Sequence, residues 1–299
     1  MISGKKIRCI INPFSGSGQR NEVADTLQRW SKEQQVDLDI VFTDGKDHAT
    51  YLTDDAVNQA YFAVIAVGGD GTIHEVSKAL VNKETAFAVI PQGSGNGFCY
   101  HIGINRNIDK ALQYINQGQI TMIDSGIING TTHFINLAGI GIDGKVAYLT
   151  KKNTRRGFFP YFMNAIAEST HFKFQKLKIN FDDEEFNDEF ALVEIANGSI
   201  YGYGFNIAPR ASISDGVLDV LLIKKTMVLK YLSLIPKMLT NNIDTSPHVI
   251  YRRSKKVRIS TDEEYFFHLD GEGFIGNTDL TFEILPKSIK ILAPNSIHL

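Results

Sequence analysis

The sequence contains little cysteine and has no long apolar run. Its two cysteines, Cys9 and Cys99, stand among apolar residues, so a disulfide scaffold or a cysteine-ligated metal site has no support. No stretch approaches the roughly 20 apolar residues of a membrane-spanning helix. Arg8 interrupts the apolar part of the N-terminus, which argues against a signal peptide. We therefore expect a cytoplasmic protein.

An excess of charge of one sign is also missing. The chain has 31 Lys and Arg against 33 Asp and Glu, a formal net charge of −2, and 43% hydrophobic residues. This balance gives no global attraction to nucleic acid or to an anionic membrane. A length of 299 residues is long for one domain and comfortable for two. We expect two domains and no nucleic-acid partner.

Short apolar strands alternate with helical patterns in the first 120 residues. The expected strands are KIRCIIN, VDLDIVFT, YFAVIAVGG and TAFAVIPQG. Such alternation predicts a parallel sheet covered by helices, with ligands at the carboxyl ends of the strands. After residues 125–130 the pattern changes to strands and turns, and a helix is expected at 226–240. This second part is predicted to be a mostly antiparallel domain.

Three glycine-rich loops follow expected strands of the first domain. They are NPFSGSG at 12–18, GGDGT at 68–72 and PQGSGNGF at 91–98. Glycine lets backbone N–H groups approach phosphate oxygens closely, and a helix N-terminus that follows adds a favourable dipole. Three such loops on one sheet predict a nucleotide site. Neither the Walker motif nor the dinucleotide-binding fingerprint fits these spacings.

Further motifs follow in the second half: GIGIDGKV at 139–146, ISDGVLDV at 213–220 and LDGEG at 269–273. With the three loops, this order resembles the diacylglycerol kinase and sphingosine kinase superfamily, most closely the compact bacterial lipid kinases of the YegS type. The resemblance implies an N-terminal α/β domain like that of NAD kinase and phosphofructokinase. It also implies a C-terminal, mostly antiparallel β-sandwich domain, with the active site in the cleft between them. The expected bounds are 1–127 and 128–286, with 287–299 returning to the first domain.

The resemblance assigns roles to residues of the first domain. Asp70 would be catalytic and would order the nucleotide phosphates and their Mg²⁺, and Thr43 would lie near the adenosine. The other implied nucleotide contacts are Asn12, Ser15, Gly16, Gly68, Gly69, Gly71, Thr72, Gly93, Ser94, Gly95 and Asn96. Some of these residues also have a purely structural interpretation. Thr72 and Glu75 match a helix capping box, and Asp44-Gly45, which follows Thr43, matches an ordinary turn. The family pattern is broken at FCYH, residues 98–101, where close bacterial relatives often carry small residues and an arginine.

The second domain would supply the acceptor chemistry. By resemblance, Glu272 is the general base for the acceptor hydroxyl and Asp143 faces the lipid head group. Arg156 resembles a cation that reaches the ATP phosphates, and Asp215 resembles a ligand of a structural Mg²⁺. Simpler interpretations remain for each of the last three: a helix cap for Asp143, a solvated basic face for Arg156, and a turn for Asp215. The histidines lack metal-ligand spacing, which leaves them surface or supporting roles.

The sequence thus predicts an ATP-dependent lipid kinase that uses Mg²⁺ and phosphorylates a hydroxyl of a diacylglycerol, a sphingoid base or a related lipid. Its lipid substrate implies transient membrane contact. The apolar stretches 155–168 and 231–239 are expected in the core, with a lipid-facing surface as the alternative. The oligomeric state stays open, a homodimer being one option. A NAD kinase and a non-catalytic nucleotide-binding regulator are the rival functions.

Overall fold

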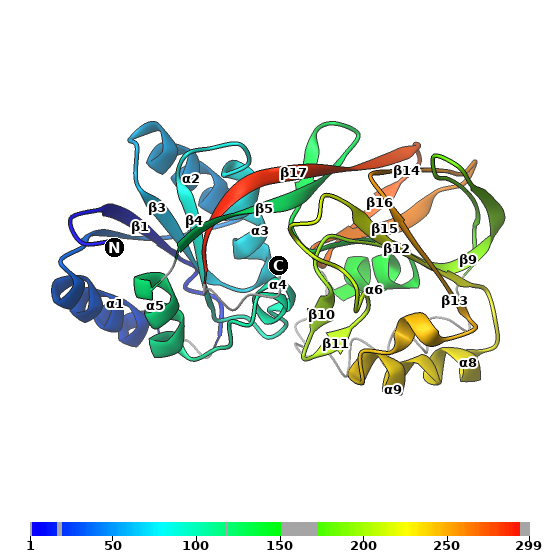
Figure 1. Ribbon diagram of the computed structural model, residues 1–299, viewed down its shortest axis with the longest axis horizontal. Helices are drawn as coiled ribbons and strands as arrows, with labels where there is room; N and C mark the ends of the chain where they lie inside the picture. Colours follow the sequence, from blue (N-terminus) through cyan, green and yellow to red (C-terminus); the bar gives the residue numbers. More distant parts are fainter. Residues whose placement is uncertain (1, 17–19, 118, 151–172, 294–299) are drawn as a thin grey trace. The chain divides into compact units, whose positions relative to one another are not determined.

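The computed structural model describes residues 2–16, 20–117, 119–150 and 173–293 (Figure 1). The chain divides into two compact units, each described below by itself. The first unit contains Met1–Asp124 together with Lys287–Leu299, and the second contains Ser125–Pro286. Among the described residues, no helix is long and apolar enough to cross a membrane.

A parallel sheet forms the centre of the first unit. Its strands are β2 (Asp37–Phe42), β1 (Lys6–Ile11), β3 (Ala63–Gly68) and β4 (Ala86–Pro91), in that spatial order. The last part of β17 (Leu280–Ala293) adds a further parallel strand beside β4. Strands β3 and β4 are buried along their whole length, which explains why both are continuous apolar runs. The predicted parallel sheet is therefore confirmed.

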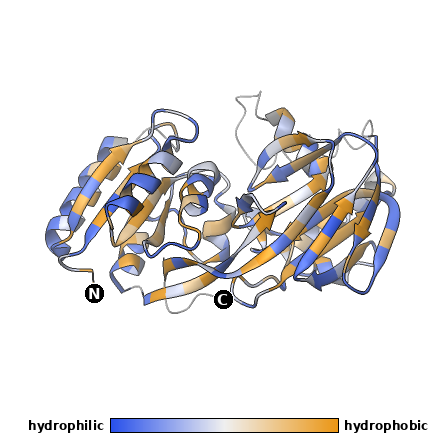
Figure 2. Ribbon diagram, turned by 90° about the horizontal axis from the view of Figure 1, so that it is seen from above, coloured by the Kyte–Doolittle hydropathy of each residue, from blue (hydrophilic) through white to orange (hydrophobic). Residues whose placement is uncertain are grey.

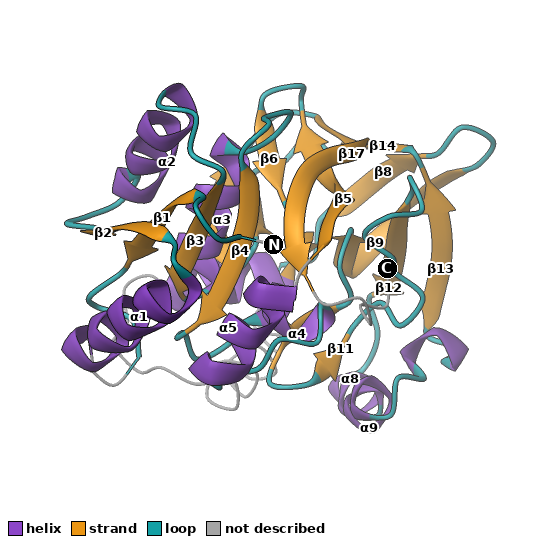
Figure 3. Cartoon of the chain, turned by 60° about the vertical axis from the view of Figure 1, so that its left-hand side comes forward, coloured by secondary structure: helices purple, strands orange, loops and turns teal. Residues whose placement is uncertain are grey.

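Helices connect the parallel strands and cover the sheet. They are α1 (Arg20–Gln34), α2 (His48–Asn58), α3 (Asp70–Ala79), α4 (Gly97–His101) and α5 (Ile108–Gln117). Helix α1 packs against α5, and α2 packs against α3. Strand order 2-1-3-4 with right-handed crossovers places these two pairs on opposite faces of the sheet, as Figure 3 shows.

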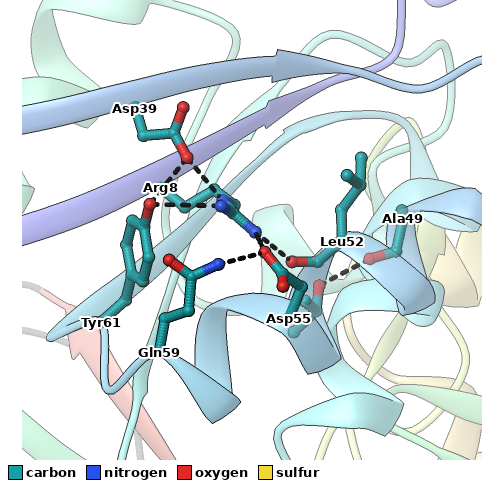
Figure 4. Close-up of polar contacts among 8 residues, drawn as sticks. Arg8, Asp39, Ala49, Leu52, Asp55, Gln59 and Tyr61 are labelled. Carbon is teal, nitrogen blue, oxygen red and sulfur yellow. Dashed lines mark hydrogen bonds and ion pairs between the residues drawn. The ribbon is translucent and has the colours of Figure 1, made fainter.

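A buried arginine ties β1 to β2 and α2 (Figure 4). Arg8 lies 2.8 Å from Asp39 and 2.6 Å from Asp55, and it also donates to the Leu52 carbonyl and to the Tyr61 hydroxyl. Burial alone would lower the pKa of Arg8, but its hydrogen bonds to the two carboxylates and the phenol raise that pKa above its ordinary value. The guanidinium therefore stays charged, and it holds the helix to the sheet.

The second unit is built from antiparallel strands. They include the last part of β5 (Gln119–Ile128), β6 (Thr132–Phe134), β7 (Leu137–Gly141), β8 (Lys176–Asn180), β9 (Glu185–Ala196), β12 (Leu218–Lys224), β13 (Val249–Ser254), β14 (Lys256–Ser260), β15 (Tyr265–Leu269) and β16 (Glu272–Gly276). The first part of β9 pairs with β8, and its last part pairs with β7 and β12. One long strand thus belongs to two sheets, as in a sandwich whose strands switch sheets.

The core of this sandwich is apolar, as the orange strands in Figure 2 indicate. Phe134, Phe190, Phe282, Val193 and Val220 are all 2% exposed or less. They come from strands of both sheets, and burial of such side chains is the main favourable contribution to folding. The predicted antiparallel β-sandwich is confirmed.

Short elements complete the second unit. Helix α6 (Ile142–Thr150) follows β7, and β10 (Ile200–Gly202) pairs with β11 (Phe205–Asn206). The single helix expected at 226–240 is wrong. The chain instead forms α8 (Val228–Leu232) and α9 (Leu234–Leu239), which are separated at Ser233. Pro236 has no backbone N–H and sits in the first turn of α9, where none is needed, so the proline favours a new helix start there.

Candidate functional site

The three glycine-rich loops meet at the carboxyl ends of β1, β3 and β4. A Cβ added to Gly93 would lie 2.4 Å from the Gly69 Cα, so the second and third loops touch through their backbones. The first loop reaches the second because Asn12 Nδ2 donates to Thr72 Oγ1 at 3.1 Å. Side chains larger than hydrogen at either glycine would separate the loops. Glycine at these positions is therefore a packing requirement.

The first loop also approaches the third. Gly16 has a φ of +75°, and a Cβ there would lie 3.0 Å from the Gln92 carbonyl oxygen. The Ser15 hydroxyl donates to the Asn12 carbonyl at 2.8 Å, and Asn12 Oδ1 accepts from the Phe14 N–H at 2.9 Å. These local hydrogen bonds hold the loop in a turn. The described part of the loop ends at Gly16.

Asp70 bridges the second and third loops. One of its carboxylate oxygens accepts from the Asn96 N–H and the other from the Gly97 N–H, each at 2.8 Å. Asn96 has a φ of 53°, a left-handed conformation that asparagine tolerates, and Gly97 begins α4. The carboxylate thus satisfies two backbone donors at the start of a helix. Asp70 therefore has a structural role in addition to the role that the resemblance implies.

The third loop has buried and exposed residues. Asn96 is 1% exposed, donates through Nδ2 to the Gly93 carbonyl at 2.8 Å, and has no hydrogen-bond partner at Oδ1 among the described residues. Ser94 is exposed and Gly95 is half-buried. Arg106, which the sequence analysis missed, also donates to the Gly93 carbonyl. In the sequence, the only hint of Arg106 is that a cation follows shortly after FCYH, residues 98–101, where this chain differs from the family pattern.

The expected capping box at Thr72 and Glu75 is wrong. Helix α3 begins at Asp70 with Gly69 as its N-cap, so Thr72 already lies inside the helix. Glu75 caps a different helix: its carboxylate accepts from the N–H groups of Asp47 and Ala49, both at 3.0 Å, at the start of α2. The box pattern failed because the N-cap is Gly69, three residues before the Thr72 that the motif requires at this position.

Thr43 lies at the carboxyl end of β2. It is 7% exposed, and its N–H donates to the Ile11 carbonyl at 2.9 Å, which continues the pairing of β1 with β2. Because β1 leads into the Asn12 loop, Thr43 lies at the same edge of the sheet as the glycine-rich loops. Gly68, the last residue of β3, is held close to Thr72, since a Cβ there would lie 2.4 Å from Thr72 Oγ1.

A tight turn positions Glu272 in the second unit. Asp270 and Gly271 have φ values of 47° and 85°, the pattern of a two-residue hairpin turn between β15 and β16. The Asp270 carboxylate accepts from the three backbone N–H groups of residues 135–137, at 2.9–3.1 Å. Glu272 is the first residue of β16 and is half-buried. Asp270 therefore both forms the turn and anchors the hairpin that carries Glu272.

Helix α6 packs directly on this hairpin. A Cβ on Gly273 would lie 2.0 Å from the Tyr148 N, and a Cβ on Gly144 would lie 2.6 Å from the Phe267 Cα. Both glycines are therefore required for the helix to touch β15 and β16. Asp143 stands in the first turn of α6, so this close packing brings it to the strands that carry Glu272.

Asp143 belongs to a buried polar cluster with Glu194, His268 and Tyr201. Asp143 Oδ2 lies 2.9 Å from His268 Nε2 and 3.3 Å from the Tyr201 hydroxyl, and Oδ1 accepts from the Gly144 N–H at 2.7 Å. Glu194 Oε2 lies 2.5 Å from the same hydroxyl and 3.6 Å from His268 Nε2. Sequence reasoning gave His268 a surface or supporting role and missed Glu194, which lies in the apolar second half of β9.

Burial and proximity perturb the pKa values in this cluster. Burial alone would lower the pKa of His268, but the Glu194 and Asp143 carboxylates raise it to about 10. Burial raises the pKa of Glu194 to about 8, although the attraction of His268 opposes this. Burial would also raise the pKa of Asp143, but the charge and hydrogen bond of His268 lower it overall. Near pH 7 the histidine is therefore charged, Asp143 is ionised and Glu194 is mostly protonated.

Asp215, on the turn before β12, has its partners outside these clusters. Asp215 forms an ion pair with Arg253, and its Oδ1 accepts from the Val217 N–H at 3.2 Å, which is the geometry of a turn before β12. Arg156 lies outside the described residues, as does the apolar stretch 155–168. Leu234 and Met238, from the stretch 231–239, are buried as expected, whereas Leu239 is 53% exposed.

Comparison with known proteins identifies the family. The family model of the diacylglycerol kinase catalytic domain matches residues 6–128. The model of the YegS C-terminal, NAD kinase β-sandwich-like domain matches residues 136–293. The chain belongs to the diacylglycerol kinase-like lipid kinases. The two matches follow each other along the chain, as the resemblance of the motifs implied.

Relatives of this lipid kinase match over almost the whole chain. A diacylglycerol kinase of Bacillus subtilis (strain 168) is 29% identical over 296 residues, covering 97% of each chain. One from Staphylococcus aureus (strain MRSA252) is 29% identical and covers 98% of this chain and 94% of its own. A crystal structure of a candidate diacylglycerol kinase from Bacillus anthracis str. Sterne matches with a TM-score of 0.84 at 25% identity, covering 98% of each chain.

The contact between glycine loops predicts the effect of two matched substitutions in the lipid kinase. Gly93→Ala places a methyl group against the Gly69 backbone and should lower the free energy of unfolding by roughly 1–3 kcal/mol. Gly71→Ala is the control, because no atom lies within 4 Å of its Cβ position and alanine favours the helix. Urea unfolding followed by circular dichroism measures both. Equal stability of the two variants would contradict the packing requirement.

The buried cluster predicts a pH dependence of stability. Glu194 and His268 have folded pKa values of about 8 and about 10, above their ordinary values of 4.5 and 6.5. The folded protein therefore holds protons that the unfolded chain releases, so stability should fall as the pH rises from 6.5 to 8. Each retained proton contributes a slope of at most about 1.4 kcal/mol per pH unit. Other titratable groups also contribute to the pH dependence of the unfolding free energy. The test therefore compares variants with the wild type.

In the Glu194→Gln variant, the free energy of unfolding should fall less steeply with pH, by the contribution of one retained proton, about 1.4 kcal/mol per pH unit at most. Glu84→Gln, at a glutamate whose side chain is 95% exposed, makes the same chemical change on the surface and should leave the slope as in the wild type. Urea unfolding at pH 6.5, 7.2 and 8 supplies the three slopes. If Glu194→Gln and the wild type lost stability in parallel, the buried carboxyl would not be retaining its proton.

Proposed function

We propose that this lipid kinase transfers the γ-phosphoryl group of ATP to a lipid hydroxyl, of a diacylglycerol, a sphingoid base or a related lipid. The observation that carries the proposal is the convergence of three glycine-rich loops around Asp70. Converging backbone N–H groups and the N-terminus of α3 suit the phosphates of a nucleotide. The nucleotide contacts would be Asn12, Ser15, Gly16, Thr43, Gly68, Gly69, Gly71, Thr72, Gly93, Ser94, Gly95, Asn96 and Arg156.

The oxygen atoms near Asp70 suit Mg²⁺. Magnesium prefers oxygen ligands and keeps several waters, so one or two protein oxygens suffice. Asp70 offers a carboxylate, and the adjacent Asn96 has a buried Oδ1 without a hydrogen-bond partner among the described residues. A bound Mg²⁺ would neutralise phosphate charge during transfer. At Asp215, by contrast, a structural ion would have to displace the Arg253 guanidinium.

Glu272 is the proposed general base. Transfer forms a bond between the acceptor oxygen and the γ-phosphorus, breaks the bond from that phosphorus to the β-phosphate, and releases ADP. The proton of the acceptor hydroxyl passes to the Glu272 carboxylate. The Asp270 anchor fixes the backbone beside Glu272, which limits the positions that the carboxylate can take. Asp143, on the helix that packs against the same hairpin, would lie beside the lipid head group.

Transfer of labelled phosphate from ATP tests this function. We expect the purified chain to label a lipid of the panel diacylglycerol, sphinganine, ceramide and phosphatidylglycerol in mixed micelles, with Mg²⁺ present. NAD is included as an acceptor because a NAD kinase would label it instead. Labelling of NAD alone would contradict the proposal, and nucleotide binding without labelling of any acceptor would favour a non-catalytic regulator.

Substitutions at Asp70 and Glu272 separate the proposed roles. Asp70→Asn keeps the shape of the side chain but weakens its charge interactions, so transfer should fall by about 10² or more, equivalent to about 2.7 kcal/mol of barrier. Glu272→Gln removes the proton acceptor, so kcat should fall while the Kd for ATP stays unchanged. Glu264→Gln, at an exposed glutamate before β15, is the matched control. Near-normal turnover in either folded variant would remove its assigned role.

A further inference from the structure

Three side chains of types that ligate metals meet in the buried cluster of the second unit. Asp143 lies on α6, Glu194 on β9 and His268 on β15. Asp143 Oδ2 is 2.9 Å and Glu194 Oε2 is 3.6 Å from His268 Nε2. Ligand atoms that share one ion at about 2.0–2.2 Å are roughly 2.8–3.6 Å apart, in geometries between octahedral and tetrahedral. The two distances in the cluster therefore suit ligands of one ion.

Gly139, on β7, leaves the room in which these three atoms meet. A Cβ built there would lie 2.3 Å from Asp143 Oδ2, 2.6 Å from Glu194 Oε2 and 2.7 Å from His268 Nε2. One ligand atom from each of the three side chains lies within 4.8 Å of the others. Any larger residue at position 139 would push these atoms apart. Three polar atoms from three elements thus point to one place in the interior.

Hydrogen bonds within the cluster leave part of its polar capacity unused. Glu194 is 0% exposed, and its Oε1 has no hydrogen-bond partner among the described residues. His268 is 2% exposed, and its Nδ1 has no partner in that part of the chain either. Buried polar atoms are almost always paired, and an ion is one of the few explanations when they are not. A carboxylate that ligates an ion uses one or both of its oxygens, so the unpaired Glu194 oxygen independently points to a ligand.

The formal charges of the cluster also suit a divalent cation. Two buried carboxyl groups face a single imidazole, and buried charges are costly unless they are compensated. The cluster is neutral with one proton each on Glu194 and on the imidazole. It is equally neutral with a divalent cation in place of those two protons, because metal ligands bind in their deprotonated forms.

We propose that Asp143, Glu194 and His268 form a binding site for a divalent transition-metal ion such as Zn²⁺. An imidazole ligand suits Zn²⁺ and its neighbours in the transition series, whereas Mg²⁺ and Ca²⁺ prefer oxygen ligands alone. The Tyr201 hydroxyl lies 3.3 Å from Asp143 Oδ2 and 2.5 Å from Glu194 Oε2, beside the fourth position of such an ion. The three ligands belong to the second unit, and the site does not depend on the proposed nucleotide site.

The role of this ion is to fasten α6, β9 and β15 to one another. Its ligands stand far apart in the sequence, with 125 positions between Asp143 and His268. His268 pairs with Gly273 on β16, the residue that follows Glu272. An ion held by His268 would therefore also steady the hairpin that carries the proposed base.

Equilibrium dialysis of the chelator-treated full chain against micromolar Zn²⁺, followed by elemental analysis, tests the site. We expect one Zn²⁺ per chain that millimolar Mg²⁺ does not displace. Glu194→Gln and His268→Gln each remove a ligand and should weaken binding by at least about 10²-fold. Glu84→Gln, at a side chain that is 95% exposed, is the matched control and should bind as the wild type does. A wild type that retains no Zn²⁺, or folded site variants that bind it as tightly as Glu84→Gln, would overturn the proposal.

Thermal unfolding measures the fastening role. Zn²⁺ at about 100-fold above its Kd should raise the Tm of the wild type by roughly 5 °C, because it binds the folded chain and not the assembled ligands' unfolded segments. The Tm of His268→Gln should not change on addition of Zn²⁺. An equal rise in His268→Gln and in the wild type would overturn the assignment of the ligands.

If neither site variant folds, crystals of the wild type grown with Zn²⁺ decide the question. Anomalous diffraction at the zinc absorption edge should give a peak within bonding distance of His268 Nε2 and both carboxylates. Zinc peaks at other residues alone would overturn the proposal. None of these measurements uses ATP or a lipid, so a failure of the proposed kinase activity would leave them unaffected.

Discussion

The proposed nucleotide site of this lipid kinase depends on one carboxylate. Asp70 begins α3 after the second glycine-rich loop, and it accepts the first backbone N–H groups of the helix that follows the third loop. Without this bridge, the start of α4 would have unpaired donors. The second and third loops would then keep the contact of Gly69 with Gly93 and the hydrogen bonds from the Gln92 and Gly93 N–H groups to the Gly68 carbonyl. The same residue that the family resemblance makes catalytic is therefore also the one that shapes the proposed site.

The proposed acceptor site is likewise organised by an aspartate that accepts backbone N–H groups. Asp270 accepts three backbone N–H groups and so fixes the turn before Glu272, while Gly144 and Gly273 let α6 contact the hairpin directly. His268, on β15 of that hairpin, forms the buried ion pair with Asp143 of α6. In each unit an aspartate holds the backbone of the proposed site. In the first unit this is Asp70, which is itself proposed to act, and in the second it is Asp270, which fixes the backbone beside Glu272. A half-buried carboxylate that accepts several backbone N–H groups limits motion, because its hydrogen bonds are costly to leave unmade.

The parallel sheet, the antiparallel sandwich and the glycine loops could be predicted from the sequence, because continuous apolar runs and glycine spacing depend on local backbone rules. The partners of individual polar residues could not. Glu75 caps α2 from a neighbouring helix, and Glu194 lies in the apolar second half of β9, 74 positions before His268. Such contacts join residues distant in sequence, and no local pattern encodes them. The family motifs found Asp143 but not the histidine that neutralises it.

The central claim is that a nucleotide binds where the three glycine-rich loops converge. Amide hydrogen exchange with and without ATP and Mg²⁺ measures this directly, since bound phosphates occupy backbone donors and suppress local opening. We predict slower exchange at residues 12–16, 68–72 and 93–97, with AMP, which lacks the β- and γ-phosphates, giving weaker protection. Protection confined to residues 125–286, with none in the three loops, would contradict the account.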